Sequence, residues 1–252
     1  MGFSSAFLGT VHGTPALRAC RPALLVPRIA SAPIALAPSG IDGLPLAAQT
    51  ATVAGIFVAL GLGSTLLTAG AQAVTDVIPP RAKTLTGGAL ACLLGAAFIF
   101  AGYAHFAFEG AYTAIYPPQG TWGFWYLPGS AEFHVAWTGG AEALGGLGLL
   151  LGGLGDLFGD PLSGGRARPL RQLSASALFL LMVAVFPANI YQYTHGAIMV
   201  GLPGPETGAP DGPLPLDYHY VRLAVQIVLL SLLSVLSKEE GKAGQKGGGA
   251  AA

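Results

Sequence analysis

Residues 134–155 form an apolar, glycine-rich stretch that is long enough to cross a lipid bilayer as a helix. Its interior carries one ionisable side chain, that of Glu142. A carboxylate at membrane depth is costly unless it is paired or protonated, so Glu142 is expected to have a partner or a function. Small residues also repeat along one face of this helix, at Ala141, Gly145, Gly148 and Gly152. Because such a face lets a neighbouring helix approach closely, the sequence predicts that Glu142 points into a packed bundle and not at lipid.

The composition agrees with a membrane protein. Of the 252 residues, 52% are hydrophobic and 10% are charged, and the mean hydropathy is +0.60, which is unlike an ordinary soluble domain. Four further apolar segments are long enough to span a bilayer: 50–71, 86–108, 173–195 and 219–237. The sequence therefore predicts an all-α membrane protein with five spans and the lipid bilayer as its main partner. The net charge of zero suggests no nucleic-acid partner.

Residues 1–45 have the composition of an organelle transit peptide. They contain Arg18, Arg21 and Arg28, with no acidic residue before Asp42. Alanine and proline are frequent, which favours a chloroplast over a mitochondrion. A disordered cytosolic tail is the alternative interpretation. At the other end of the chain, residues 238–252 are predicted to be a flexible tail.

The distribution of lysine and arginine predicts the orientation. With five spans, the first and third connections and the C-terminal tail lie on one side of the membrane. These segments hold eight lysine and arginine residues, whereas after removal of the transit peptide the other side holds only Arg222. The basic side is expected to face stroma, matrix or cytosol.

The two connections on the opposite side differ in composition. Residues 109–133 are rich in tyrosine and tryptophan, and such rings favour the membrane–water interface, so this connection is expected to lie on the bilayer surface. Residues 196–218 are rich in glycine and proline and are not expected to form a regular element.

Polar residues of four predicted helices fall at one depth, on the side away from the basic loops. His105 and Asn189 lie near the ends of their helices, whereas Glu142 lies near the start of its helix. Arg222 and Gln226 lie near the start of the last helix and share a face with His219. Glu142 and Arg222 are the expected ion pair, with His105, Asn189 and Gln226 as hydrogen-bonding neighbours. Pro187, just before Asn189, is expected to open its helix.

A purely structural role for this polar cluster is the alternative, because buried polar groups in membrane bundles often only fix the helix register. His134, His195 and His219 lie near helix ends, where a wetted interfacial histidine is the simpler interpretation. No histidine spacing indicates a metal or haem site. The two cysteines, Cys20 and Cys92, offer neither a disulfide framework nor a metal site.

Three segments resemble the DoxX/DoxD-like membrane proteins: 101–106 (AGYAHF), 140–150 (GAEALGGLGLL) and 185–191 (VFPANIY). They occur in the order and spacing of that family, and the resemblance covers residues 85–237. It implies a DoxX-like four-helix transmembrane bundle, here with one extra N-terminal transmembrane helix at 50–71.

The resemblance implies a quinone-linked redox membrane subunit. In that role Glu142 would relay a proton, Arg222 would hold an anion or the carboxylate, and His105 and Asn189 would bond a quinone carbonyl. The sequence offers no intrinsic cofactor motif, so electrons would be carried by quinone or by a partner membrane protein. A non-catalytic assembly or scaffold protein is the alternative. A small-solute permease fits less well, because no inverted repeat is evident.

Overall fold

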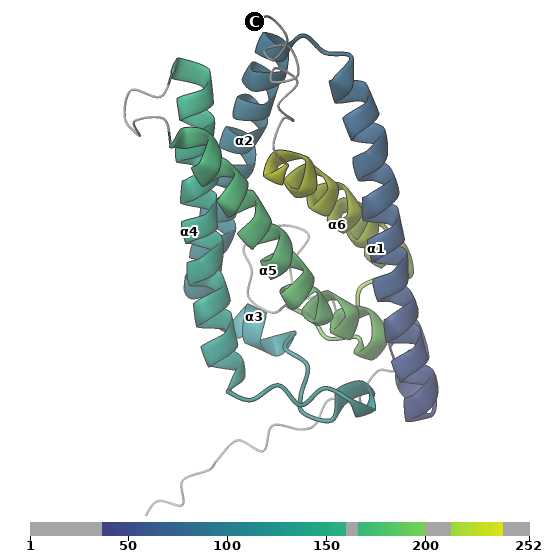
Figure 1. Cartoon of the computed structure of the whole chain (residues 1–252). Helices are drawn as coiled ribbons and strands as arrows, with labels where there is room; N and C mark the ends of the chain where they lie inside the picture. Colours follow the sequence, from purple (N-terminus) through teal and green to yellow (C-terminus); the bar gives the residue numbers. More distant parts are fainter. Residues whose placement is uncertain (1–36, 160–165, 200–212, 239–252) are drawn as a thin grey trace, which may run out of the picture. The chain divides into compact units, whose positions relative to one another are not determined.

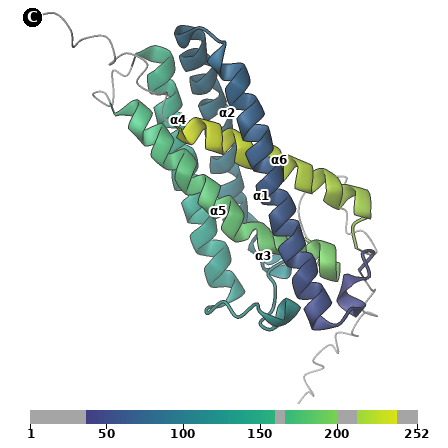
Figure 2. The ribbon, with the colours of Figure 1, turned by 45° about the vertical axis from the view of Figure 1, so that its right-hand side comes forward.

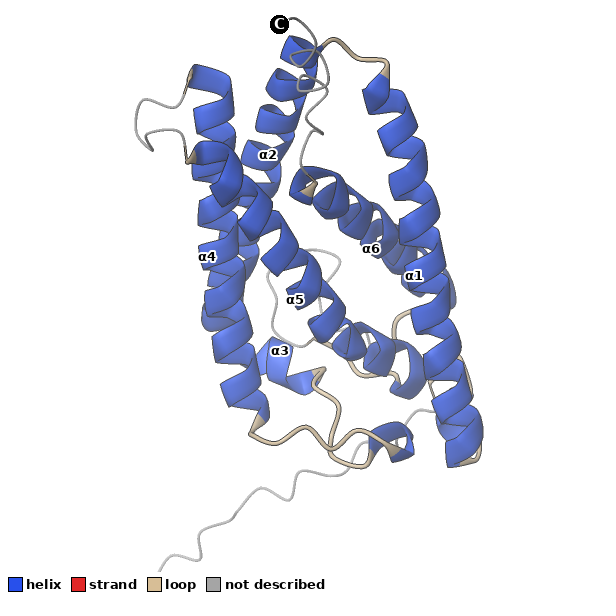
Figure 3. Cartoon of the chain, in the orientation of Figure 1, coloured by secondary structure: helices blue, strands red, loops and turns tan. Residues whose placement is uncertain are grey.

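The computed structural model describes residues 37–159, 166–199 and 213–238 (Figure 1). Five long helices are present: α1 (Leu46–Asp76), α2 (Pro80–Ala107), α4 (Ala131–Phe158), α5 (Ala167–His195) and α6 (Leu216–Ser237). The short α3 (Glu109–Ala114) follows α2, and two 3-10 turns, η1 (Ile41–Gly43) and η2 (Thr121–Gly123), complete the regular structure. Within these ranges the chain is all helix and loop, without strands (Figure 3).

Each long helix contains one of the five apolar segments and is long and apolar enough to cross a membrane. The prediction of an all-α protein with five candidate spans is therefore confirmed. Side chains on the outer faces of the helices are large, apolar and exposed, as expected for contact with lipid. Examples are Leu93, Phe100, Leu144, Leu173 and Val225.

Local signals explain several helix ends. Pro80 occupies the first turn of α2, where its missing N–H costs nothing. The Ser130 side chain accepts a hydrogen bond from the Phe133 N–H and caps α4. Gly159 and Gly196 adopt left-handed conformations that end α4 and α5. By contrast, α5 continues through Pro187, so the expected opening there does not interrupt the helix.

The long helices pack as a row in the order α2, α4, α5, α6, α1 (Figures 1 and 2). Successive long helices alternate in direction, so the ends of α2 and α5 meet the starts of α4 and α6 at one end of the row. We call this the polar end, and the opposite end the basic end. In the described part of the chain α6 does not pack along α2, so the row does not close as a four-helix bundle would.

Glycines bring α2 and α4 unusually close. A Cβ atom on Gly102 would lie 2.5 Å from the Gly139 carbonyl oxygen, and one on Gly95 would lie 2.7 Å from that of Gly146. These glycines recur every seven residues on both helices, so the two backbones stay in contact over several turns. This interface holds Glu142 in a fixed position between α2 and the rest of the row.

The small-residue face predicted on α4 packs against α5. A Cβ on Gly145 would lie 2.7 Å from Leu178, and one on Gly152 would meet the Arg171 backbone at 2.9 Å. The prediction of close helix contact along this face is therefore confirmed. Arg171 itself is buried in α5 and pairs with Asp156 of α4, so this cation joins two helices at the basic end.

Residues 37–45 are part of the folded structure. Ala37 and Ile41 are buried, and the Ser39 hydroxyl donates to the Tyr193 carbonyl of α5 at 2.7 Å. The Gln49 amide donates to the carbonyl of Leu44 at 2.9 Å. The helical unit thus begins before residue 45, the end predicted for the transit peptide. Residues 1–36 and the predicted tail from 239 onward lie outside the described part.

Candidate functional site at the polar end

The predicted polar residues divide into two groups at the polar end. Glu142 and His105 lie together between α2 and α4. Asn189, His219 and Arg222 line a cavity between α1, α5 and α6. The side chain of Tyr112 on α3, which the sequence analysis did not single out, acts electrostatically with both groups.

Glu142 is buried, and its Oε2 atom lies 3.8 Å from Nε2 of His105, which is buried as well. The other ring nitrogen of His105, Nδ1, lies 3.2 Å from the Val135 carbonyl oxygen. Since a carbonyl only accepts, Nδ1 carries a hydrogen, and Nε2 is the atom that can take up a proton next to the carboxyl group. The pair can therefore hold one proton in two ways, either on Glu142 or on His105.

Tyr112 of α3 packs on the His105 ring. Its ring centroid lies 4.0 Å from that of His105. Burial raises the pKa of Tyr112, the charge of Glu142 raises the same pKa further, and the charge of Arg222 lowers it. The phenol thus lies within electrostatic reach of both Glu142 and Arg222, which belong to different helices.

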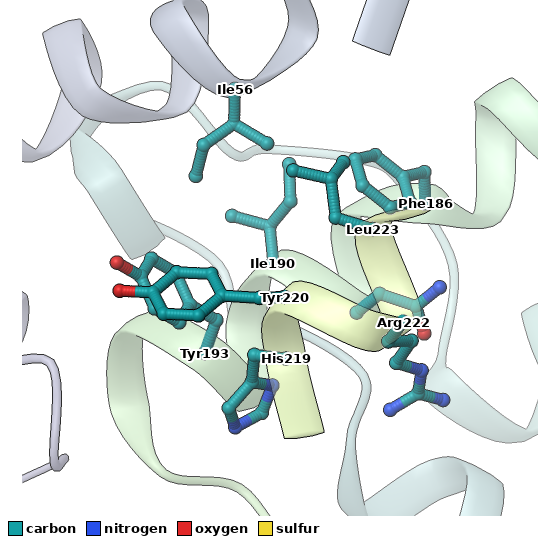
Figure 4. Close-up of a pocket in the computed structure, with 9 residues that line it drawn as sticks. Ile56, Phe186, Ile190, Tyr193, His219, Tyr220, Arg222 and Leu223 are labelled. Atoms are coloured by element: carbon teal, nitrogen blue, oxygen red, sulfur yellow. The ribbon is translucent and has the colours of Figure 1, made fainter. Parts of the chain in front are cut away.

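The cavity between α1, α5 and α6 has a volume of about 110 Å³, several times the ~10–15 Å³ that one water needs. Figure 4 shows the apolar Ile56, Ile190 and Leu223 on one side and the polar His219 and Arg222 on the other. Phe186, Asn189, Tyr193 and Tyr220 complete the lining. The lining is therefore mostly apolar, with a few polar groups on one side, as in a site for an amphipathic ligand.

Two polar atoms of this lining are buried without a hydrogen-bond partner, Nη1 of Arg222 and Nε2 of His219. The Arg222 guanidinium lies 5.9 Å from the ring centroid of Tyr218. A buried donor without an acceptor costs about 1–3 kcal/mol, and more when it is charged. A ligand oxygen in the cavity would relieve this cost.

The predicted ion pair between Glu142 and Arg222 is not formed: no carboxylate among the described residues lies within 4.0 Å of the Arg222 side chain. The reason is the order of the row, in which α5 lies between α4 and α6. The amide of Gln226 donates to the Met182 carbonyl at 3.2 Å, so this residue joins α6 to α5 and does not line the cavity. The sequence identified the shared depth of these residues but not the order of the helices.

The aromatic connection 109–133 only partly follows its prediction. Phe124 and Tyr126 are exposed, as expected at an interface, but Trp122 is fully buried. Its indole N–H donates to Thr194 of α5 at 3.0 Å, and its carbonyl accepts from Thr50 of α1 at 2.6 Å. This connection folds back into the polar end, and the prediction that it lies on the bilayer surface is wrong for Trp122.

The interpretation of His134 and His219 as wetted residues is also wrong, because both are buried. Nε2 of His134 donates to the Pro128 carbonyl at 2.8 Å, and Nδ1 accepts from Trp137 at 3.0 Å, so this ring is fully used in holding the start of α4. His195 is half-buried and stacks on Tyr191 at 4.9 Å. The described ranges contain no group of three histidine, cysteine or acidic residues that could hold a metal ion.

Comparison with known proteins found no matching family model, and no curated protein or solved structure that is significantly similar to this chain. The likeness to DoxX/DoxD-like proteins therefore remains a prediction from three sequence segments.

Proposed function

We propose that this chain is a DoxX-like membrane protein that binds a quinone and serves as the membrane subunit of a redox complex, in a chloroplast membrane. The observation that supports the proposal is the cavity between α1, α5 and α6. It combines apolar surface with an unpartnered donor of Arg222 and an unpartnered ring nitrogen of His219. Its position inside a set of five membrane-length helices makes a lipid-soluble ligand the natural occupant.

The lining fits the head of a quinone, which is a flat ring with two carbonyl acceptors. Arg222 offers a free donor, and the amide of Asn189 lies in the same cavity, whereas Nε2 of His219 is an unpartnered ring nitrogen. Phe186 and Ile190 offer apolar surface for the ring. His105, which the resemblance assigned to a quinone carbonyl, faces Glu142 and does not line the cavity. The proposal therefore gives the carbonyl contacts to Arg222 and Asn189.

When bound, a quinone would supply two-electron, two-proton redox chemistry. Arg222 would donate to one of its oxygens, Nε2 of His219 would accept from the hydroxyl group of the reduced form, and the Glu142–His105 pair would hold a proton near the polar end. Electrons would come from a partner redox protein. Arg222 would also stabilise negative charge that develops on the ligand oxygen.

Quinone binding to the full chain in lipid nanodiscs tests the proposal. Asn189→Leu should weaken binding about fivefold, because one neutral hydrogen bond contributes ~1 kcal/mol. Arg222→Gln should weaken it by about tenfold or more, because hydrogen bonds to charged groups contribute ~1.5–3 kcal/mol. Gln172→Leu is the matched control for Asn189→Leu. Gln172 lies on α5 as Asn189 does, but at the basic end, where its amide donates to the Lys238 carbonyl. Unchanged affinity in both cavity variants would contradict the proposal.

An assembly or scaffold role is the second candidate. It is favoured by polar side chains that only join helices, such as Gln226 to the Met182 carbonyl and Ser231 to the Ser64 carbonyl at 3.1 Å. A stoichiometric partner that co-purifies equally with the wild type and with Arg222→Gln, without any quinone binding, would support this role instead.

A further inference from the structure

Buried polar atoms without a hydrogen-bond partner gather at the polar end. Apart from Nε of Arg171, all such side-chain atoms in the described part of the chain lie there. They belong to Asp42, Gln49, Tyr116, Trp125, Glu142, Gln192, His219 and Arg222. Gln192 is the extreme case, because it is almost fully buried and both its amide nitrogen and its amide oxygen lack a partner.

Such a concentration has a physical consequence. More than about 90% of buried polar groups in proteins have a partner, and each one without a partner costs about 1–3 kcal/mol. Polar interiors of sufficient size are filled by water, whereas apolar ones stay dry. The orphaned atoms therefore indicate water inside the polar end.

A line of polar side chains leads from the aromatic connection to Glu142. The Tyr116 ring, just after α3, lies 6.1 Å from that of Trp125 in the connection itself. Tyr112 lies one turn before Tyr116 and contacts His105 at 4.0 Å between ring centroids. His105 in turn faces Glu142 at 3.8 Å. Glu142 Oε2, at the end of this line, is itself unpartnered.

Beyond Glu142, towards the basic end, α2 and α4 are in tight contact. Gly146 of α4 packs against Gly95 of α2, where an added Cβ would lie 2.7 Å from the opposite carbonyl oxygen. Phe98 and Leu149 are buried at the same level. The backbones leave no room for water between these two helices, so the space between them opens towards Glu142 from the polar end.

We propose that Tyr112 and Tyr116 line a water passage from the side of the 109–131 connection to the Glu142 carboxyl group, which exchanges its proton with that side alone. The ligand of this site is thus water and the proton. The ionisable groups that face Glu142 are His105 from α2 and Tyr112 from α3, while Arg222 of α6 acts on Tyr112. The passage does not depend on quinone binding, and it stands if the cavity takes another ligand.

Hydroxyl-radical footprinting of the full chain in nanodiscs tests the water passage. Radicals generated from water oxidise side chains that water contacts. After correction for intrinsic reactivity, His105 should be oxidised several-fold faster than Phe98, which is buried two turns away on the same helix, and faster than Tyr103, which faces outward near the depth of His105. Oxidation of His105 at the rate of Phe98 would overturn the proposal.

A pair of variants sharpens this test. Tyr112→Ala uncovers His105 and should raise its oxidation several-fold, whereas Tyr103→Ala, on the outward face of α2, should leave it unchanged. Equal effects of the two variants would show that Tyr112 does not line the passage. The wild-type measurement stands by itself if Tyr112→Ala fails to fold.

Proton exchange is measured separately, in liposomes that hold the chain in one orientation. The infrared carboxyl signal of Glu142 is identified by its loss in Glu142→Gln. The intensity of this signal should change after a pH jump on the side of the 109–131 connection. It should not change after a pH jump on the other side. One-sided access would be refuted if the signal responded to a pH jump on the basic side, responded equally to jumps on both sides, or responded to neither. No quinone is present, so failure here is distinct from failure of the proposed function.

Discussion

Trp122 anchors the connection between α3 and α4 to two helices. It is fully buried, and its backbone has a φ of 56°, a left-handed value that is costly for a residue with a side chain. The hydrogen bonds to Thr194 and Thr50 hold it in this conformation. The strain is therefore offset by contacts with two helices, which tie α1 and α5 together at the polar end.

We predict that Trp122→Ala lowers the free energy of unfolding by ~3–5 kcal/mol, because it leaves a large cavity. Thr194→Val should cost ~1–3 kcal/mol, because the indole N–H remains buried without an acceptor. Thermal unfolding in detergent, followed by circular dichroism, measures both effects. Thr86→Val, at an exposed site, is the control and should stay within ~0.5 kcal/mol of the wild type. Destabilisation no greater than that of the control would show that Trp122 is not packed as described.

The contact between Glu142 and His105 gives a second prediction at this scale. A double-mutant cycle of Glu142→Gln with His105→Gln should show a coupling of ~0.5–3 kcal/mol, since the two side chains meet. A cycle of Glu142→Gln with Arg222→Gln should be additive to within about 0.5 kcal/mol, because these residues make no direct contact. The free energy of unfolding in detergent is measured in both cycles. If Glu142 were strongly coupled to Arg222 and not to His105, then Arg222 and not His105 would be the partner of Glu142.

At the scale of the helices, the α2–α4 interface depends on particular glycines. Gly139 and Gly140 are neighbours on α4, yet only Gly139 is in contact with α2. A Cβ there would lie 2.6 Å from Cβ of His105, whereas one on Gly140 would meet nothing within 4 Å. Gly139→Ala should therefore destabilise the protein by ~1–3 kcal/mol. Gly140→Ala should be neutral or stabilising by up to ~1 kcal/mol, because alanine favours the helix. Unfolding midpoints in detergent compare the two, and equal effects would argue against a close α2–α4 contact.

The sequence predicted where the helices lie in the chain better than it predicted which helices pack against each other. Hydropathy located all five spans, and the spacing of Gly145, Gly148 and Gly152 located a packing face, because both signals are local. The order of the helices in the row depends on contacts between residues that are far apart in the sequence, and local patterns do not reveal these contacts. The predicted ion pair of Glu142 with Arg222 was wrong for this reason. Trp122 and Tyr112 were missed as site residues for a related reason: interfacial aromatic residues and aromatic residues that fold back into a bundle have the same local sequence pattern.

At the scale of the whole molecule, charge and helix direction agree. The helix directions bring the start of α2 with Arg81 and Lys83, the start of α5 and Lys238 to the basic end, while the aromatic connection and the cavity lie at the polar end (Figure 1). Arg171 remains on the basic side although it is buried against Asp156. The proposed passage and the proposed quinone site thus share the side that carries few cations, where a positive-inside orientation places the lumen, intermembrane space or exterior.

This orientation can be tested with two tags in one chain, one inserted at the exposed Leu127 and one placed after Lys238. Because α4, α5 and α6 separate these positions by three spans, they must lie on opposite sides of the membrane. In sealed membranes of one orientation, protease should remove one tag and spare the other, and permeabilisation should expose the second. The tag after Lys238 should lie on the stromal, matrix or cytosolic side, the side favoured by lysine and arginine. Digestion of both tags before permeabilisation would require an even number of spans between them. It would also place the mouth of the proposed water passage and the basic connections on the same side, which the alternation of the helices does not permit.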